Sequence, residues 1–251
     1  MNRVFIIKTL LLLLYCIPGC SDSTNNPEET NQEPSTLTNS IKWGEQVTVN
    51  NSPGTFGSEY GRMFQLKNGD WLAVYTILRN DGYKQDPDGG RELQISRSRD
   101  NGETWIEVAT ITDPGRDLDN GQMIQFNDGT ILLAARSVRW QESYHLPVYK
   151  STDNGHTWTY LSTIDFNEGT PGSLGNPDKG VYGPHFGFLA DGRLAVMYAN
   201  ETHVTDSPSY SQIISQKISA DNGATWGDEI WVAAQQGAAR PGMPVWTRME
   251  N

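Results

Sequence analysis

The polar segments of this 251-residue sequence contain carboxylates, arginines and aromatic rings, three kinds of side chain that act together on sugars. Hydrolysis of a glycosidic bond needs two carboxylates, one as an acid or base and one as a nucleophile or base. Arginines and amides hydrogen-bond hydroxyl groups, while an aromatic ring offers a flat apolar face. The candidate catalytic carboxylates are Glu59, Asp119 and Glu201. The candidate substrate-binding residues are Arg62, Asn120, Arg136, Trp140, Tyr182, His185 and Arg240.

A repeated hairpin signal places these candidates in the fold. The turn dipeptides Asn68-Gly69, Asp128-Gly129 and Asp191-Gly192 lie about 60 residues apart and predict tight β-hairpins. Apolar runs that predict strands follow the turns, at residues 71–75, 131–135 and 194–198. A fourth turn would fall at Asn251, the last residue.

A second repeat, Ser-x-Asp-x-Gly-x-Thr-Trp, begins at Ser98, Ser151 and Ser219. In such a box the aspartate bonds to nearby backbone, the glycine supplies a left-handed conformation and the tryptophan covers the turn. We therefore expect the boxes to be structural, without a catalytic role for their aspartates. Their key residues are Asp100, Gly102 and Trp105, then Asp153, Gly155 and Trp158, then Asp221, Gly223 and Trp226.

A repeat of about 60 residues with four short strands is typical of a β-propeller blade. If the strands of a blade are named a to d from the axis outward, the a–b and c–d turns lie on one face of the propeller. The b–c loops and the d–a crossovers then lie on the other face, where longer loops favour function. The candidate residues belong to these loops or to the starts of the a strands, so they line a funnel around the axis.

Other interpretations of single residues stay open. Arg62 and Asp119 also suit structural ion pairs near the axis, and His185 suits a packed polar position. No group of His, Asp and Glu has the spacing of metal ligands, so we predict no metal site and no cofactor.

The start of the sequence predicts export. Arg3 and Lys8 precede an apolar run, and Ile17-Pro18-Gly19-Cys20 resembles a bacterial lipoprotein signal that is cleaved before an acylated cysteine. An ordinary secretory signal is the alternative. We expect three regions: a signal peptide at 1–19, lipidated Cys20 with a polar stalk at 20–40, and a partial propeller at 41–251. The predicted location is the bacterial cell envelope, at the outer membrane or cell surface, held by a lipid anchor.

The net charge of −11 argues against a nucleic-acid partner. It is compatible with neutral or basic ligands, although acidity in an exported protein also serves solubility.

The three boxes, each paired with an upstream glycine hairpin, resemble the sialidase-type Asp-box, or BNR-repeat, propellers, which have six blades. The resemblance implies an all-β fold with about three blades and the start of a fourth. Within this superfamily, several segments are similar to exo-acting arabinan hydrolases and related bacterial glycosidases: Asp119-Asn120-Gly121, Tyr198-Ala199-Asn200-Glu201 and Arg240-Pro241-Gly242-Met243-Pro244.

The sequence departs from these relatives at one important place. They have a Glu-Pro pair where this chain has Gly183-Pro184, and the resemblance implies that the glutamate is catalytic. A second acid is expected on the strand after the fourth hairpin, beyond Asn251. True sialidases place their first arginine in a Phe/Tyr-Arg-Ile-Pro segment, of which Tyr60-Gly61-Arg62-Met63 keeps only the arginine.

Three functions remain in order of preference. The first is an exo-glycoside hydrolase that acts on an oligo- or polysaccharide, with hydrolysis by this chain in question. The second is a non-catalytic carbohydrate-binding or scaffold lipoprotein, and the third is an exo-sialidase. An incomplete ring also leaves two blade faces uncovered, so self-association is a further expectation.

Overall fold

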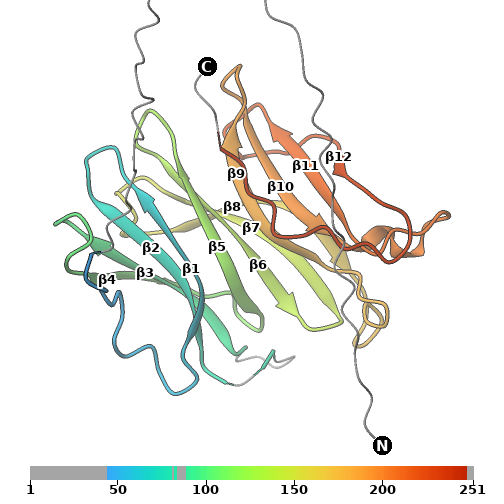
Figure 1. The fold of residues 1–251 in the computed structure, drawn as a ribbon, viewed down its shortest axis with the longest axis horizontal. Helices are drawn as coiled ribbons and strands as arrows, with labels where there is room; N and C mark the ends of the chain where they lie inside the picture. The colour runs from blue at the N-terminus through green and yellow to red at the C-terminus, as the bar shows by residue number, and fades with distance from the viewer. Residues whose placement is uncertain (1–43, 81, 84–88, 248–251) are drawn as a thin grey trace, which may run out of the picture. The chain divides into compact units, whose positions relative to one another are not determined.

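The structure, a computed structural model, describes residues 44–80, 82–83 and 89–247 (Figure 1). The predicted signal peptide, Cys20 and the predicted stalk lie outside the described residues, as does Asn251. Glu45–Asn251 forms one compact unit.

The described chain is almost entirely β-structure and forms three four-stranded antiparallel sheets. Each sheet is one predicted blade, with its strands in sequence order from one edge to the other. The first blade contains β1 (Ser58–Gln65), β2 (Trp71–Leu78), β3 (Arg91–Ser98) and β4 (Ile106–Ile111). The second contains β5 (Asp117–Gln125), β6 (Ile131–Arg139), β7 (Ser143–Ser151) and β8 (Thr159–Glu168). The third contains β9 (Val181–Phe188), β10 (Leu194–Asn200), β11 (Ile213–Ser219) and β12 (Ile230–Ala233), with a 3₁₀ turn η1 (Thr202–Thr205) after β10.

The three apolar runs of the sequence become β2, β6 and β10, and nearly all their residues are buried. A strand covered on both faces carries apolar residues continuously rather than alternately. One core lies between the first and second blades and includes Leu72, Ile95 and Leu133. The other lies between the second and third and includes Leu132, Tyr144 and Tyr198. The blades are therefore stabilised mainly by packing against each other.

The hairpins and the Asp-boxes lie on the same face of the unit. Gly69, in the first hairpin, has a φ of +91°, and Trp71 Nε1 donates a hydrogen bond to Asn101 Oδ1 in the first box over 3.2 Å. In each box the aspartate accepts hydrogen bonds from the serine two residues before it and from the threonine four residues after it. The local chemistry of the repeat thus closes the same turn three times.

The innermost strand of every blade is interrupted by a bulge at the same place. The register of pairing shifts between Glu59 and Arg62 in β1 and between Asp119 and Gln122 in β5, and it shifts again within β9. The residue at the centre of each irregularity has a positive φ: +54° at Tyr60, +57° at Asn120 and +55° at Gly183. A bulge changes the direction in which the neighbouring side chains point, and these bulges lie beside the propeller axis.

A fourth copy of this conformation occurs beyond the third blade. Met243 has a φ of +51°, and the segment around it passes along β9 (Figure 1). Residues 234–247 contain no strand; among the described residues, the pairing of this segment is one isolated parallel bridge between Gly237 and Tyr210. Trp246 nevertheless packs against the face of the third blade that is turned away from the second blade, on the cluster of Met197, Ala199 and Ile214.

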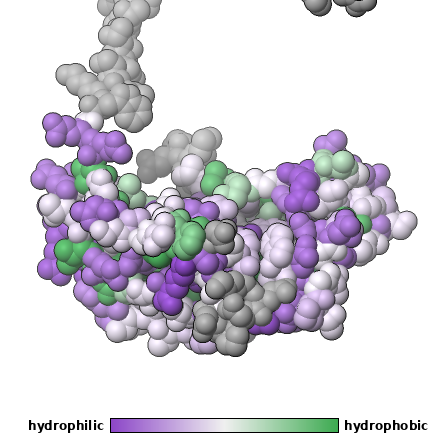
Figure 2. Space-filling model, turned by 90° about the horizontal axis from the view of Figure 1, so that it is seen from below, coloured by the Kyte–Doolittle hydropathy of each residue, from purple (hydrophilic) through white to green (hydrophobic). Residues whose placement is uncertain are grey.

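Seen from below, the surface is mainly hydrophilic or intermediate, and several of its apolar patches lie over the first blade (Figure 2). Exposed apolar side chains in that blade include Met63 and Ile106. Among the described residues, no helix has the length and apolar character that spanning a membrane requires.

Candidate functional site

Five of the predicted site residues meet in one hollow of about 380 Å³, bordered by all three blades and by the segment after β12. This hollow is called the axial pocket below. It is lined by Tyr60, Tyr83, Arg136, Trp140, Asp178, Tyr182, Ala199, Glu201, Gln212, Arg240, Gly242 and Met243.

The fold brings these residues together by two devices. The bulges turn Tyr60, Tyr182 and Met243 toward the axis from equivalent positions next to the left-handed residue or at it. The ends of the second strands and their loops supply Trp140 and Glu201. The pocket therefore lies at the ends of the strands that carry the b–c loops, and the Asp-boxes lie at the opposite ends.

Aromatic rings form one wall of the axial pocket. Tyr83 and Trp140 stack with their ring centroids 5.3 Å apart and their planes within 4° of parallel. Tyr144 makes edge contacts with Trp140 at 6.3 Å and with Tyr182 at 5.6 Å. Each ring is held in place by another, and Arg91 Cζ lies 4.0 Å from the centroid of the Tyr83 ring, which Trp140 covers from its other side. Trp140 is therefore the ring of this wall that we expect to meet a sugar.

Asp119 lies beneath this wall and holds Arg136. Arg136 Nε donates to Asp119 Oδ1 over 2.8 Å, a second guanidinium nitrogen donates to Oδ2, and Tyr83 Oη donates to Oδ2 over 2.5 Å. The Asp119 carboxylate is completely buried, and burial raises its pKa well above the ordinary value, while Arg91 and Arg62 oppose that rise. With both oxygens occupied, Asp119 is placed to orient Arg136 and not to contact a ligand.

Arg136 extends between two aromatic rings. Its Cζ atom lies 5.1 Å from the ring centroid of Tyr83 and 5.0 Å from that of Tyr182, distances at which a cation is attracted to a ring face. Burial lowers the pKa of Arg136, and the neighbouring Tyr182 hydroxyl opposes this change. Only 9% of Arg136 is exposed, so it can contact a ligand through one limited side.

Glu201 borders the pocket but is covered by Arg240. Its Oε2 accepts a hydrogen bond of 3.2 Å from the backbone of Gly180, and its Oε1 pairs with the Arg240 guanidinium. The Arg240 side chain is 51% exposed, whereas that of Glu201 is 1% exposed. Burial, and then the charge of Glu201, raises the pKa of Tyr182. A ligand would therefore meet Arg240 before it met the carboxylate.

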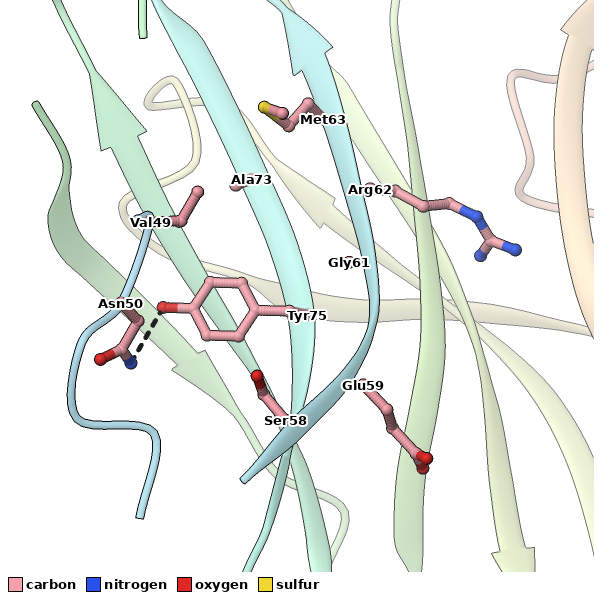
Figure 3. Close-up of a pocket in the computed structure, with 9 residues that line it drawn as sticks. All are labelled: Val49, Asn50, Ser58, Glu59, Gly61, Arg62, Met63, Ala73 and Tyr75. Atoms are coloured by element: carbon pink, nitrogen blue, oxygen red, sulfur yellow. Dashed lines mark hydrogen bonds between the residues drawn. The ribbon is translucent and has the colours of Figure 1, made fainter. Parts of the chain in front are cut away.

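Glu59 and Arg62 do not line the axial pocket. They border a second hollow, of about 350 Å³, on the first blade (Figure 3). Figure 3 shows Val49, Asn50 and Tyr75 on one side of β1, while the ends of Arg62 and Glu59 point the other way. Glu59 pairs with Arg91.

Arg62, Asn120 and His185 are packed close to the axis. Arg62 donates to the backbone carbonyls of Asn120 and Gly121, each over 3.2 Å, so it links the first blade to the second. Asn120 Oδ1 and His185 Nδ1 are buried without a hydrogen-bond partner among the described residues. Burial and the nearby Arg62 lower the pKa of His185. The alternative interpretation of Arg62 was a structural ion pair, whereas the contacts described here are with backbone carbonyls. His185 is partly buried, a position that its alternative interpretation as a packed polar residue allows.

Seven of the twelve lining residues were not among the predicted site residues: Tyr60, Tyr83, Asp178, Ala199, Gln212, Gly242 and Met243. Tyr83 is an aromatic residue in a long polar loop, which is a usable signal. Asp178 and Gln212 carry no comparable signal, because their positions depend on the paths of the loops. Within the described ranges, no group of three His, Cys, Asp or Glu residues is arranged to hold a metal ion.

Comparison with known proteins places this geometry in context. No protein-family model matches the chain. A sialidase from Paraclostridium sordellii is 31% identical over 108 residues, which are 37% of this chain and 24% of that protein. An α-L-arabinanase from Penicillium chrysogenum, solved with arabinobiose, has a TM-score of 0.61 and 27% identity, over 74% of this chain and 53% of the other. An α-L-arabinofuranosidase from Fusarium graminearum has a TM-score of 0.62 and 22% identity, over 75% of this chain and 52% of the other.

The fold is therefore that of the sialidase-like glycosidase β-propellers, three blades of which are present in the described residues. The resemblance to arabinan-cleaving enzymes that the sequence indicated is confirmed at the level of fold. The chain spans about half the length of the solved structures that it matches.

Proposed function

We propose that the axial pocket binds the end of a neutral oligosaccharide of the arabinan type, as part of an exo-acting glycoside hydrolase. One observation carries the proposal. The stacked rings of Tyr83 and Trp140 border the same pocket as polar side chains that are held in fixed positions. The α-L-arabinanase with a similar fold was solved with arabinobiose, which supports a short arabinan as the ligand.

The charge pairing favours a neutral sugar over a sialic acid. Arg136 is paired with Asp119 and Arg240 with Glu201, so the two arginines of the pocket are already balanced by carboxylates. Arg62 donates to backbone carbonyls. A sialidase needs arginines that are available to the substrate carboxylate, so the similarity to a sialidase leaves that activity as the third candidate.

Hydrolysis by this chain is in question because the three candidate carboxylates are engaged. Asp119 is enclosed, Glu201 lies under Arg240 and Glu59 is paired with Arg91. The resemblance implies a catalytic glutamate at Gly183. A Cβ atom built there would lie 3.4 Å from Asn120 Nδ2 and 3.6 Å from Met243 Sδ, so space does not exclude a side chain, but the φ of +55° would strain the backbone of a glutamate.

The test is titration calorimetry of the 251-residue chain with arabinobiose and with a sialyl-lactoside. Arabinobiose should bind and the sialoside should not. Trp140→Ala should weaken arabinobiose binding about tenfold, the loss expected for one stacking contact. Tyr160→Ala is the matched control, because Tyr160 is an exposed aromatic residue of β8 outside the pocket and its loss should leave the affinity unchanged.

A kinetic measurement tests whether this chain hydrolyses a glycoside. The wild-type chain and Gly183→Glu should both hydrolyse aryl arabinofuranosides no faster than buffer, since one carboxylate without its partner does not complete the mechanism. Turnover by the wild type that disappears in Glu201→Gln would show that Glu201 already acts and would contradict our interpretation of Gly183. Absence of binding to arabinobiose at any pH would refute the proposed ligand.

The second function class is a carbohydrate-binding surface lipoprotein without catalysis. It shares the sugar site and differs only in turnover, so turnover of an aryl arabinofuranoside by the wild type would exclude it. For either class we propose attachment to the bacterial cell envelope through Cys20.

A further inference from the structure

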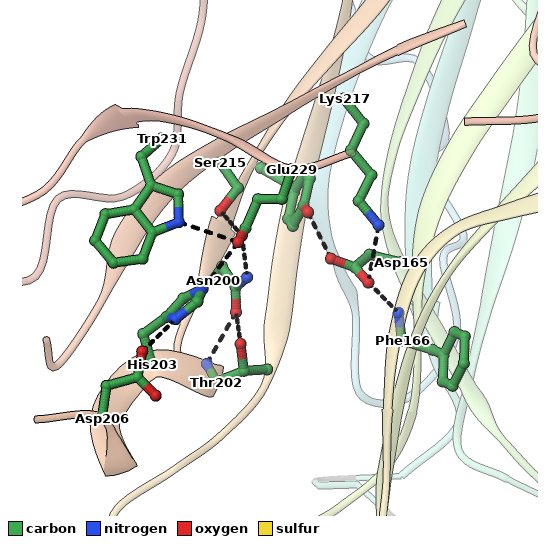
Figure 4. Close-up of polar contacts among 11 residues, drawn as sticks. Asp165, Phe166, Asn200, Thr202, His203, Asp206, Ser215, Lys217, Glu229 and Trp231 are labelled. Carbon is green, nitrogen blue, oxygen red and sulfur yellow. Dashed lines mark hydrogen bonds and ion pairs between the residues drawn. The ribbon is translucent and has the colours of Figure 1, made fainter. Parts of the chain in front are cut away.

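Glu229, which precedes β12, connects the elements that surround the loop of Glu201. Its carboxylate accepts hydrogen bonds from four side chains: Asn200 Nδ2 at 2.7 Å, Ser215 Oγ at 2.5 Å, Trp231 Nε1 at 3.0 Å and His203 Nε2 at 2.9 Å. Figure 4 shows these side chains converging on the carboxylate from β10, β11, β12 and η1. A carboxylate that receives four donors is well satisfied, so the group is rigid as well as charged.

The same network fixes the backbone on both sides of Glu201. Asn200, the residue before it, donates to Glu229 and accepts hydrogen bonds from the backbone nitrogen of Thr202 at 2.9 Å and from its hydroxyl at 2.7 Å. His203, two residues after Glu201, donates to the same carboxylate. Residues 200–203 are thus tied to Glu229, although Glu201 itself faces the axial pocket.

His203 is held between two carboxylates. Its Nδ1 lies 2.7 Å from Asp206 Oδ2, on the other side of the ring from Glu229, and its ring meets that of Trp231 edge-on at 4.7 Å. A neutral imidazole carries one proton, so it cannot donate from both nitrogens; the protonated form can. Both contacts are hydrogen bonds only when His203 is a cation.

We propose that Glu229 and His203 are positioning residues for Glu201, acting as a proton-dependent clamp on residues 200–206. The proposal rests on the proposed sugar site, because the clamp matters to function only if Glu201 and its partner Arg240 border the ligand. An irregular loop is usually mobile, and a binding site needs its groups held within fractions of an ångström. The clamp supplies that constraint.

The sign of the pH dependence follows from the neighbours of His203. Burial lowers its pKa, but the hydrogen bonds to Asp206 and Glu229 outweigh burial and leave the pKa above its ordinary value. Although burial raises the pKa of Glu229, the hydrogen bonds from Ser215 and the other donors lower it below its ordinary value. The clamp is therefore complete below the unfolded-state pKa of histidine and opens as the pH rises through the folded-state pKa. The next charged groups, Asp165 and Lys217, pair with each other.

Hydrogen exchange of the unliganded protein tests the clamp without any sugar. Protection factors for the amides of residues 201–206, corrected for intrinsic exchange, should fall about tenfold between pH 5.5 and pH 8.5, the effect of losing one charge-assisted hydrogen bond. His203→Gln should show the low value at every pH, because glutamine donates but does not titrate. Glu229→Gln should do the same with unchanged secondary structure.

Glu168→Gln is the matched control. Glu168 pairs with His145 on the second blade, so it removes a histidine–carboxylate pair outside the clamp. This variant should keep the protection of residues 201–206 and its pH dependence. If His203→Gln also keeps both, the clamp does not exist.

Arabinobiose titration then tests whether the clamp serves the pocket. The affinity of the wild type should fall with rising pH in parallel with the protection factors, and His203→Gln should give a flat profile at the weaker value. Binding by the wild type with a pH profile that His203→Gln leaves unchanged overturns the positioning role. Failure of arabinobiose to bind at all refutes the proposed ligand, while the exchange data still decide the clamp.

Discussion

The glycines of the three Asp-boxes provide a direct test of how the blades hold together. Gly102, Gly155 and Gly223 occupy the same position of the repeat with φ values of +93°, +87° and +87°. Replacement by alanine should therefore strain the backbone equally in all three boxes, by about 1 to 2 kcal/mol. Any difference between the three variants must come from the surroundings of the new methyl group.

The surroundings differ sharply. A Cβ atom at Gly155 would lie 2.9 Å from Leu72 Cδ1, and one at Gly223 would lie 2.7 Å from Leu132 Cδ1. Both leucines are almost fully buried between blades. At Gly102 the nearest atom, in Trp105, would be 3.9 Å away, which is an ordinary contact.

Overpacking a core typically costs about 1 to 3 kcal/mol. Gly155→Ala and Gly223→Ala should thus reduce the free energy of unfolding by about 2 to 5 kcal/mol in total, and Gly102→Ala by only about 1 to 2 kcal/mol. Urea unfolding followed by tryptophan fluorescence measures these values, and the slopes should remain equal among the variants. Equal losses in all three variants would refute the conclusion that the second and third boxes are wedged against the preceding blade.

Three further outcomes are expected. Asp153→Ala should lower the free energy of unfolding by about 1 to 2 kcal/mol, because local hydrogen bonds are lost, and should leave the affinity for arabinobiose unchanged. A loss of affinity at unchanged stability would contradict the conclusion that the Asp-boxes lie on the face opposite the pocket. Hydrogen bonds from Thr104 and Ser98 lower the pKa of Asp100 to about 2. Its contribution to stability is therefore complete above the unfolded-state pKa of 3.8 and is lost as the pH falls through 2, and Asp100→Asn should remove that part of the acid dependence of Tm. A palmitate analogue should label the protein in growing cells, and Cys20→Ala should abolish the label; an unlabelled wild type would reject the lipid anchor.

The sequence predicted those parts of the fold that depend on local chemistry. The turn at Asn68-Gly69 and the Asp-boxes close within a few residues, so their residue types determine their geometry. The repeat then indicates the blade, because identical turns at a constant interval must enclose similar strands. The strand at 71–75, for example, is the first part of β2.

The pocket was predicted less completely because its chemistry depends on contacts between distant segments. Asp119 and Arg136 are recognisable as polar residues near the axis, but the sequence does not reveal that their side chains form an ion pair with each other. Likewise, the distance in sequence between Glu201 and Arg240 hides the ion pair that covers the carboxylate. Tyr83 completes the aromatic wall from a loop whose path no periodic pattern describes.

The left-handed residue at Tyr60, Asn120, Gly183 and Met243 has a consequence for how such a site changes over evolutionary time. The same left-handed backbone conformation occurs four times. It carries an aromatic side chain at Tyr60, an amide at Asn120, no side chain at Gly183 and a thioether at Met243. In β1, β5 and β9 this residue lies at a bulge, and Tyr60, Asn120 and Met243 show that the scaffold holds residues other than glycine in the strained conformation. Equivalent positions of the blades thus accept different residue types. A new binding specificity can therefore arise by single substitutions at these positions.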